Sequence, residues 1–171
     1  MKKFLNCFST ACLLCLYVNV SNAQAPALGS AANFVLFTTT GALGNTGITG
    51  ITGDIGTNNG AITGFGNING NMHSADGATF QCAADLLLAY NQLNNTVPTL
   101  FPGILLGNGS TLTPGVYQTP SATTISGELT LDALGDANAV FIFQIQGPLS
   151  TSFASKVKLI NGALACNVFW K

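Results

Sequence analysis

The sequence has 171 residues, of which 47% are hydrophobic and only 6% are charged, and its formal net charge is −1. All five basic residues are lysines, so the chain cannot supply the dense array of cations that a nucleic acid or an anionic membrane surface requires. The apolar fraction argues against disorder, and the length suits a single domain with a real core.

The first 23 residues have the pattern of a secretory signal. Lys2 and Lys3 form a positive start, residues 4–18 are mostly apolar, and the small residues Ser21 and Ala23 stand at the cleavage positions. The apolar stretch is short for a membrane span and is interrupted by polar residues. We therefore expect cleavage after Ala23 and a secreted protein, either extracellular or periplasmic, that has no membrane segment after cleavage.

The mature chain would be one domain covering residues 24–171. Loss of the two signal lysines leaves three lysines against six acidic residues, so its net charge is 3 − 6 = −3. Its surface must then consist mostly of hydroxyls, amides and methyl groups. The stretch NTGITGITGDIGTNNG (45–60) is the clearest example, with Asp54 as its only charge.

Residues 74–96 form the one convincing helix of the sequence. Ser74 and Asp76 are candidates for the N-cap, and Pro98 follows the end. The i, i+3, i+4, i+7 spacing predicts a buried stripe made of Phe80, Ala83, Ala84, Leu87 and Tyr90. About nineteen helical residues would span roughly 28 Å, which matches six strands stacked about 4.8 Å apart. We therefore expect the helix to cover a row of six strands.

A repeat of 24 to 28 residues follows the helix. The segments GVYQ, AVFIFQI and NVFWK place Val116, Val140 and Val168 at this spacing, and TTISG–ELTLD and LSTSF–KVKLI repeat between them. Such a period is typical of a solenoid, here with three short strands per coil and corners at Gly, Pro, Ser or Asn. The apolar run VFIFQI predicts a strand that is covered on both sides.

Cys82 and Cys166 are the two cysteines that remain after signal cleavage. In an oxidising compartment, an isolated pair favours a disulfide over a metal site. Two free buried thiols are the alternative.

Residues that could support catalysis are few. His73 is the only histidine, and a polar residue just before the helix is the simpler interpretation of it. Asp132 and Asp136 could suggest the paired carboxylates of a glycoside hydrolase, but they flank the turn LDALGDAN, where Asp is common for backbone reasons. We expect a protein that is not an enzyme and that needs no cofactor or metal.

Several long motifs, in order, resemble the ice-binding protein family (DUF3494). They are LGSAANFVLFTTTGALGNTG, ITGDIGTNNGAITGFG, ADLLLAYNQLN, LTPGVYQT, LTLDALGDANAVFIFQI and LINGALACNVFW, which together cover residues 28–171. The resemblance implies a mainly β fold, a discontinuous right-handed β-solenoid of triangular section with one long helix alongside. Similar proteins continue past the last motif, so the resemblance also implies that further C-terminal coils are missing here.

The resemblance implies binding to an ice crystal surface and its ordered water, with inhibition of ice growth or recrystallisation. Threonines three apart, as in residues 45–60, cannot share one face of a strand. The repeat alignment instead places LGNTG, TTISG and LSTSF on one face, and the candidates on it are Thr46, Thr123, Thr124, Ser126, Thr151 and Ser152. An extracellular structural or adhesive module on the same scaffold is the alternative function.

Overall fold

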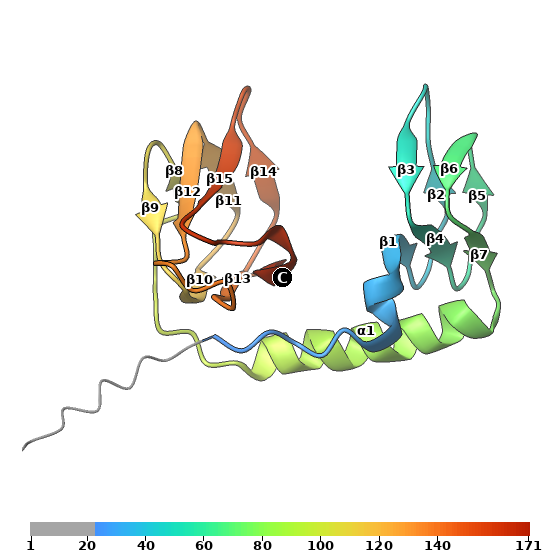
Figure 1. Ribbon diagram of the computed structural model, residues 1–171, viewed down its shortest axis with the longest axis horizontal. Coiled ribbons are helices and arrows are strands. Elements are labelled where there is room, and N and C mark those ends of the chain that lie inside the picture. Colours follow the sequence, from blue (N-terminus) through green and yellow to red (C-terminus); the bar gives the residue numbers. More distant parts are fainter. Residues whose placement is uncertain (1–22) are drawn as a thin grey trace, which may run out of the picture.

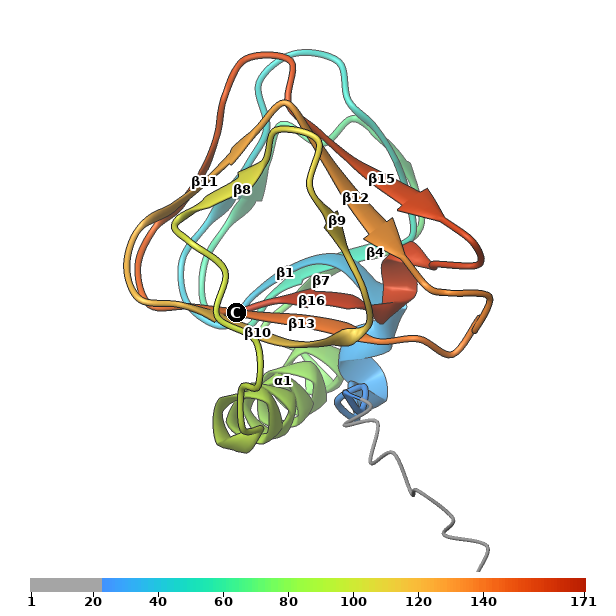
Figure 2. The same ribbon diagram turned by 90° about the vertical axis from the view of Figure 1, so that its left-hand side faces the viewer.

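The computed structural model of the protein describes residues 23–171, which form two stacks of triangular coils along one helix (Figures 1 and 2). Seen from the end in Figure 2, the chain turns clockwise as it recedes, so the coils are right-handed. The predicted fold class, a discontinuous right-handed β-solenoid of triangular section with a long helix alongside, is confirmed. The predicted signal, except Ala23, lies outside the described residues.

The N-terminal stack follows the short 3₁₀-helix η1 (Gly29–Asn33). Its strands are β1 (Phe34–Thr38), β2 (Leu43–Gly44), β3 (Gly50–Thr52), β4 (Asp54–Thr57), β5 (Ile62–Thr63), β6 (Asn67–Asn69) and β7 (Met72–Ser74). They pair in parallel as the sheets β1-β4-β7, β2-β5 and β3-β6, one on each side of the triangle.

The C-terminal stack follows the long helix. Its strands are β8 (Leu105–Gly107), β9 (Thr111–Leu112), β10 (Gly115–Thr119), β11 (Thr123–Ser126), β12 (Glu128–Asp132), β13 (Phe141–Ile145), β14 (Leu149–Thr151), β15 (Lys156–Ile160) and β16 (Val168–Trp170), the last preceded by the 3₁₀-helix η2 (Ala165–Asn167). The sheets β10-β13-β16, β14-β11-β8 and β15-β12-β9 are again parallel.

Three faces result, and each continues from one stack to the other. The helix-covered face contains β1, β4, β7, β10, β13 and β16, above α1 in Figure 1. We call the face of β2, β5, β8, β11 and β14 the hydroxyl face. The face of β3, β6, β9, β12 and β15 is the charged face, because Glu128, Lys156 and Lys158 lie on it.

The core of the C-terminal stack fills the inside of its triangle. Phe141 and Phe143 on β13 and Leu129 and Leu131 on β12 are fully buried there. The ring of Phe143 stacks on that of Trp170, with centroids 4.1 Å apart. Each such side chain contributes about 1.5–3 kcal/mol of stability by leaving water. This burial forms the interior that the apolar repeat segments predict.

Strand β13 is covered on both sides, as its continuous apolar run predicts. Ile142 points away from the triangle and packs with Leu93 of the helix, and it is fully buried. The buried Gln144 amide donates hydrogen bonds to the carbonyl oxygens of Leu93 (2.8 Å) and Thr96 (2.6 Å). These bonds satisfy carbonyl groups at the helix end that have no partner inside the helix.

The helix α1 spans Gly77–Asn95, which confirms the predicted segment, and Asp76 is its N-cap. The predicted buried stripe is wrong, because Phe80 and Leu87 are 58% and 59% exposed. The buried residues are instead Thr79, Cys82, Ala89 and Leu93. Most of these side chains are small, and their size lets the helix lie close against the sheet. Neither this helix nor any other in the described part of the chain has the length and apolar character needed to cross a membrane.

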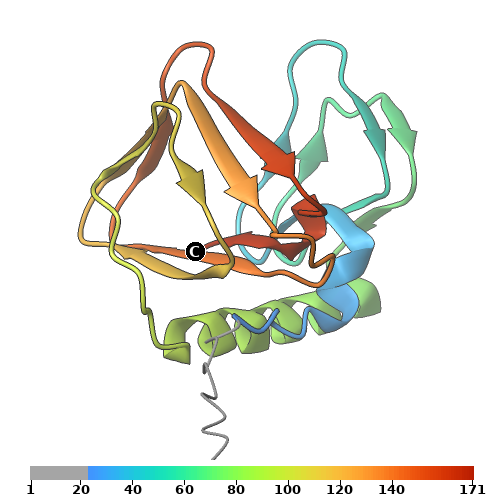
Figure 3. The same cartoon turned by 60° about the vertical axis from the view of Figure 1, so that its left-hand side comes forward.

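The expected row of six strands over the helix is broken in the middle. Strand β1 pairs with β4 and β16 pairs with β13, and the two inner strands lie on either side of an interval that α1 bridges (Figures 1 and 3). Two grooves of about 260 and 290 Å³ lie beside this middle part of the helix. Leu86 and Tyr90 line both of them.

The two stacks grow in opposite directions relative to this interval. The order β1, β4, β7 leads away from it, whereas the order β10, β13, β16 leads toward it, so that Lys171 ends beside it (Figure 1). The helix length therefore matches the prediction, but the row of strands that it covers is discontinuous.

The repeat alignment is confirmed for two of its three segments. Glu128 pairs with Lys156 and Thr123 with Leu149, as ELTLD–KVKLI and TTISG–LSTSF predict. The alignment of the valines is wrong by two residues at its first step, because Val116 pairs with Ile142, and by one residue at its second, because Val168 pairs with Phe141. A strand that is apolar on both sides gives no alternation from which its register could be read.

Candidate functional site

The hydroxyl face is built on the parallel pairing of β11 with β14. Partners in a parallel pair point to the same side of the sheet, and the buried Ile125 shows which side is the interior. Thr124 and its partner Ser150 therefore point outward. Their hydroxyl oxygens lie 2.9 Å apart, at hydrogen-bond distance.

A second outward row lies two residues further along the same strands. Ser126 is the next outward residue on β11, and Ser152 lies beside it because its N–H donates to the Ile125 carbonyl (2.9 Å) and extends the ladder. Three predicted residues, Thr124, Ser126 and Ser152, thus share one surface. Sequence reasoning missed Ser150, although the alignment of LSTSF with TTISG already placed it opposite Thr124.

Two predicted residues do not belong to this surface. Thr123 is 1% exposed, and its hydroxyl donates to Thr119 inside the stack (2.7 Å). Thr151 pairs with the buried Ile125, so it points toward the interior of the triangle. It is nevertheless exposed, because β14 is the edge strand of its sheet. Both assignments were wrong for the same reason, which is that adjacent residues of a strand point to opposite faces.

The N-terminal stack contributes a smaller part of the hydroxyl face. Gly44 pairs with Thr63 on the outward side, opposite in direction to the buried Leu43. The predicted residue Thr46 follows β2 and is exposed in the corner that leads to β3. The side-chain amide of Asn45 fixes this corner by donating to the Gly64 carbonyl (3.0 Å) of the next coil.

The charged face differs sharply in its chemistry. Glu128 lies between Lys156 (2.7 Å) and Lys158 (3.7 Å), and the hydrogen bond from Lys156 holds the pKa of this carboxyl below its usual value. By contrast, the hydroxyl-face strands β2, β5, β8, β11 and β14 contain no charged residue. The outward residues of β11 and β14 therefore form an uncharged polar surface, unlike those of β12 and β15.

The carboxylates considered for catalysis have structural roles. Asp132 accepts hydrogen bonds from the Leu134 N–H and the Asn161 amide, and Asp136 accepts from the Asn138 N–H. These contacts confirm the interpretation of LDALGDAN as a turn.

The predicted disulfide between Cys82 and Cys166 is not formed in the structure, in which both are free thiols. Cys82 is buried on α1, one turn after Thr79, whose methyl group lies near Gly56 of the N-terminal stack. Cys166 is exposed on η2, which belongs to the C-terminal stack. The break in the row of strands separates the two parts of the molecule that the prediction placed side by side.

The outward side chains of β11 and β14 form a small array of four hydroxyl groups, and the outward positions of β8 next to it are Leu105 and Gly107. Neighbouring parallel strands are about 4.8 Å apart, and residues two apart on one strand are roughly 6.7 Å apart. Each hydroxyl group can donate one hydrogen bond and accept two, so bonds between neighbouring coils leave capacity for water. Such an array can hold an ordered layer of water molecules.

Comparisons with known proteins agree with this architecture. A model of the ice-binding-like family matches residues 37–171. An ice-binding protein from Nostoc sp. (strain HG1) is 40% identical over 149 residues, which are 84% of this chain and 54% of that protein. An ice-binding protein from Flavobacterium frigoris (strain PS1) is 32% identical over 163 residues, or 84% of this chain and 57% of that protein. The chain thus spans about half the length of these curated relatives.

Solved structures show the same fold. The crystal structure of an ice-binding protein from an Antarctic Flavobacteriaceae bacterium has a TM-score of 0.84 and 59% identity, covering 86% of this chain and 35% of that one. The crystal structure of an ice-binding protein from the Antarctic ascomycete Antarctomyces psychrotrophicus has a TM-score of 0.81 and 38% identity. The match covers 86% of this chain and 73% of that one. The chain, with its triangular coils and bridging helix, belongs to the ice-binding-like family.

Proposed function

We propose that this protein is exported and adsorbs to ice through the hydroxyl face, where it slows ice growth or recrystallisation. The observation that carries the proposal is the uncharged array of Thr124, Ser126, Ser150 and Ser152 on parallel strands. Relatives and solved neighbours that are named ice-binding proteins support it. The predicted signal at residues 1–23 supports export.

The proposed mechanism depends on water that is ordered before contact with ice. Hydroxyl groups bind water molecules at the spacing of the coils, while the Thr methyl group limits the other arrangements that water can adopt. Such a layer can merge with the ice lattice. A charged side chain would bind water more strongly and in a different geometry, so the charged face is the poorer surface for this role.

Substitution on the two faces tests the proposal. Thr124→Lys puts a long charged side chain on the hydroxyl face, and Thr111→Lys makes the same change at an exposed, outward position of β9 on the charged face. We expect Thr124→Lys to abolish the shaping of ice crystals and Thr111→Lys to leave it intact. Both are surface changes that should alter stability by no more than about 0.5 kcal/mol, which circular dichroism and thermal unfolding check.

The outcomes separate the two candidate functions. Ice shaping that survives in the folded Thr124→Lys variant would show that the hydroxyl face is not the binding surface. A folded wild-type protein that neither shapes ice nor slows recrystallisation would contradict ice binding altogether. The result would then favour a structural or adhesive module on the same scaffold.

We also propose that residues 24–171 form a domain whose stack is completed by further coils between β1 and β16. Among residues 23–171, no strand pairs with the edges of β1 and β16 that face this interval, and the grooves beside it are lined by apolar residues such as Leu86 and Trp170. The longer relatives, of which the chain covers about half, have additional length that could supply these coils.

A further inference from the structure

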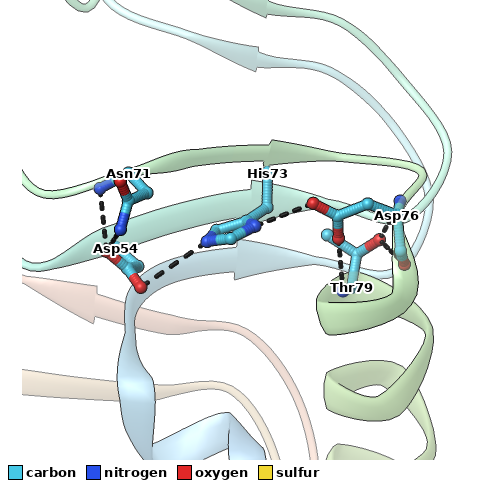
Figure 4. Close-up of polar contacts among 5 residues, drawn as sticks. All are labelled: Asp54, Asn71, His73, Asp76 and Thr79. Atoms are coloured by element: carbon cyan, nitrogen blue, oxygen red, sulfur yellow. Dashed lines mark hydrogen bonds and ion pairs between the residues drawn. The ribbon is translucent and has the colours of Figure 1, made fainter.

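His73 lies between two carboxylates that come from different elements (Figure 4). Its Nδ1 is 2.8 Å from an oxygen of Asp76, the N-cap of α1. Its Nε2 is 3.5 Å from an oxygen of Asp54, at the start of β4. His73 itself is on β7, so one imidazole ring connects two strands of the N-terminal stack with the beginning of the helix.

The two contacts cannot both be satisfied by a neutral imidazole. An ionised carboxylate only accepts hydrogen bonds, and a neutral imidazole has one N–H donor and one nitrogen lone pair. In the neutral form, one ring nitrogen would therefore direct its lone pair at a carboxylate oxygen. Only the doubly protonated ring can donate toward both Asp54 and Asp76.

Both carboxylates are held in place by further donors. One oxygen of Asp54 accepts hydrogen bonds from the backbone N–H (2.8 Å) and side-chain amide (3.3 Å) of Asn71. The Asp76 oxygen that does not face His73 accepts a hydrogen bond from the Thr79 N–H (2.9 Å), and this bond caps the helix. The carboxylates are thus oriented independently of His73, and their charges favour the protonated ring.

The surroundings of His73 contain no competing charge in the described part of the chain. Strand β1 contributes the edge of the Phe34 ring, whose centroid is 5.5 Å from that of the imidazole. The only charged residue within α1 is Asp85, and its carboxylate accepts hydrogen bonds from Ser30 instead. His73 is also partly exposed, so protons from solvent can reach it.

We propose that His73 is a pH-sensitive clamp that fastens the start of helix α1 to the N-terminal stack when its imidazole is protonated. As the pH rises through the pKa of the folded histidine, the ring loses its second proton and one of the two contacts becomes repulsive. The helix start and the strands β4 and β7 then lose a link that crosses three elements.

The direction of the pH dependence follows from the three groups. The hydrogen bond to Asp76 raises the pKa of His73 above its usual value of about 6.5. The clamp therefore contributes fully below the pKa of the unfolded histidine, and its contribution is lost as pH rises through the folded pKa. The backbone N–H groups of Asn71 and Thr79 lower the pKa of Asp54 and Asp76. Both carboxylates therefore stay ionised, and the clamp stays formed, as the pH falls to about 4.

A titration of the single histidine tests the proposal directly. His73 is the only histidine in the sequence, so its Hε1 resonance is unambiguous in the proton NMR spectrum. We expect a higher pKa in the folded protein than in the same protein unfolded in urea. A folded pKa equal to or below the unfolded one would overturn the clamp.

Variants of the two carboxylates show whether both take part. Asp54→Asn removes one charge, and Asp76→Ser removes the other while it keeps a side-chain oxygen that can cap the helix. Each should lower the pKa of His73, whereas Asp136→Asn, in a turn of the C-terminal stack, should leave it unchanged. A pKa that moves in neither clamp variant, or equally in all three, would contradict the assignment.

Thermal unfolding provides a second readout that does not depend on the carboxylate variants. The melting temperature of the wild type should fall between pH 6 and pH 9, and this fall should be smaller in His73→Asn. Equal pH dependence in the two proteins would overturn the proposal. Ice shaping need not be measured in either experiment, so failure of the clamp and failure of the proposed function remain distinct.

Discussion

At the residue scale, the two cysteines have different environments. Cys82 is fully buried beneath the N-terminal stack, and burial raises the pKa of its thiol. Cys166 is exposed on η2. Because the thiolate is the reactive form, Cys82 should be far less reactive than Cys166 in the folded protein.

A thiol titration distinguishes this arrangement from the disulfide that the sequence predicts. In residues 24–171, we expect one thiol to react rapidly in the native protein and a second to react only after unfolding in denaturant without reductant. Cys166→Ser should remove the rapid reaction. Denatured, unreduced protein with no titratable thiol would contradict the structure and restore the predicted bridge.

The hydroxyl residues show what sequence can and cannot provide at this scale. The repeat alignment placed TTISG beside LSTSF correctly, and this pairing identified the face. It did not decide between Thr123 and Thr124, because both are polar residues with high strand propensity. The apolar Ile125 two positions after Thr123 was the available signal, since residues two apart in a strand share a side.

At the element scale, helix α1 was predicted in the right place but with the wrong buried side. Periodicity favoured the large residues Phe80, Leu87 and Tyr90, whereas the sheet is met by Thr79, Cys82, Ala89 and Leu93. The distance between helix and sheet decides which side is buried, and it is set by small residues on both elements. This distance is a property of the assembled layers that the helix sequence does not contain.

At Gly56 on β4, the sheet lies close to the helix. A Cβ atom at this position would lie 2.7 Å from a ring atom of Phe34 and 3.2 Å from the methyl group of Thr79. Gly56→Val should therefore destabilise the protein by about 1–3 kcal/mol, the usual cost of overpacking. Urea unfolding measures this change.

Gly66 provides the matched control for this substitution. It is exposed, and a Cβ atom there would have no neighbour within 4 Å. Gly66→Val should change the free energy of unfolding by less than about 0.5 kcal/mol. Equal effects at the two positions would show that the helix does not approach β4 as closely as described.

At the scale of the whole molecule, the solenoid class and its triangular section could be predicted, but the broken stack could not be derived from spacing. The coil period is a local property, and it is the same on either side of the break. The order of the coils along the helix depends on which strand edges meet in space. Nothing in the spacing of the repeats specifies that β1 and β16 are the two strands that face the interval.

The unpaired edges of β1 and β16 predict a marginally stable chain. Exposed strand edges invite association with other chains, and each coil of a solenoid depends on its neighbours for stability. Adding the missing coils from a similar protein should raise the melting temperature and reduce aggregation. A monomer of residues 24–171 that unfolds sharply at high temperature, unchanged by the added coils, would show that the interval does not accept them.

Adsorption to ice through the hydroxyl face is the central claim, and partition into growing ice tests it most directly. Purified protein is frozen slowly onto a cold probe, and the fraction that enters the ice is compared with the fraction that stays in the liquid. We expect the wild type and Thr111→Lys to enter the ice and Thr124→Lys to remain in the liquid. Exclusion of the folded wild type from the ice, to the same extent as Thr124→Lys, would contradict the claim.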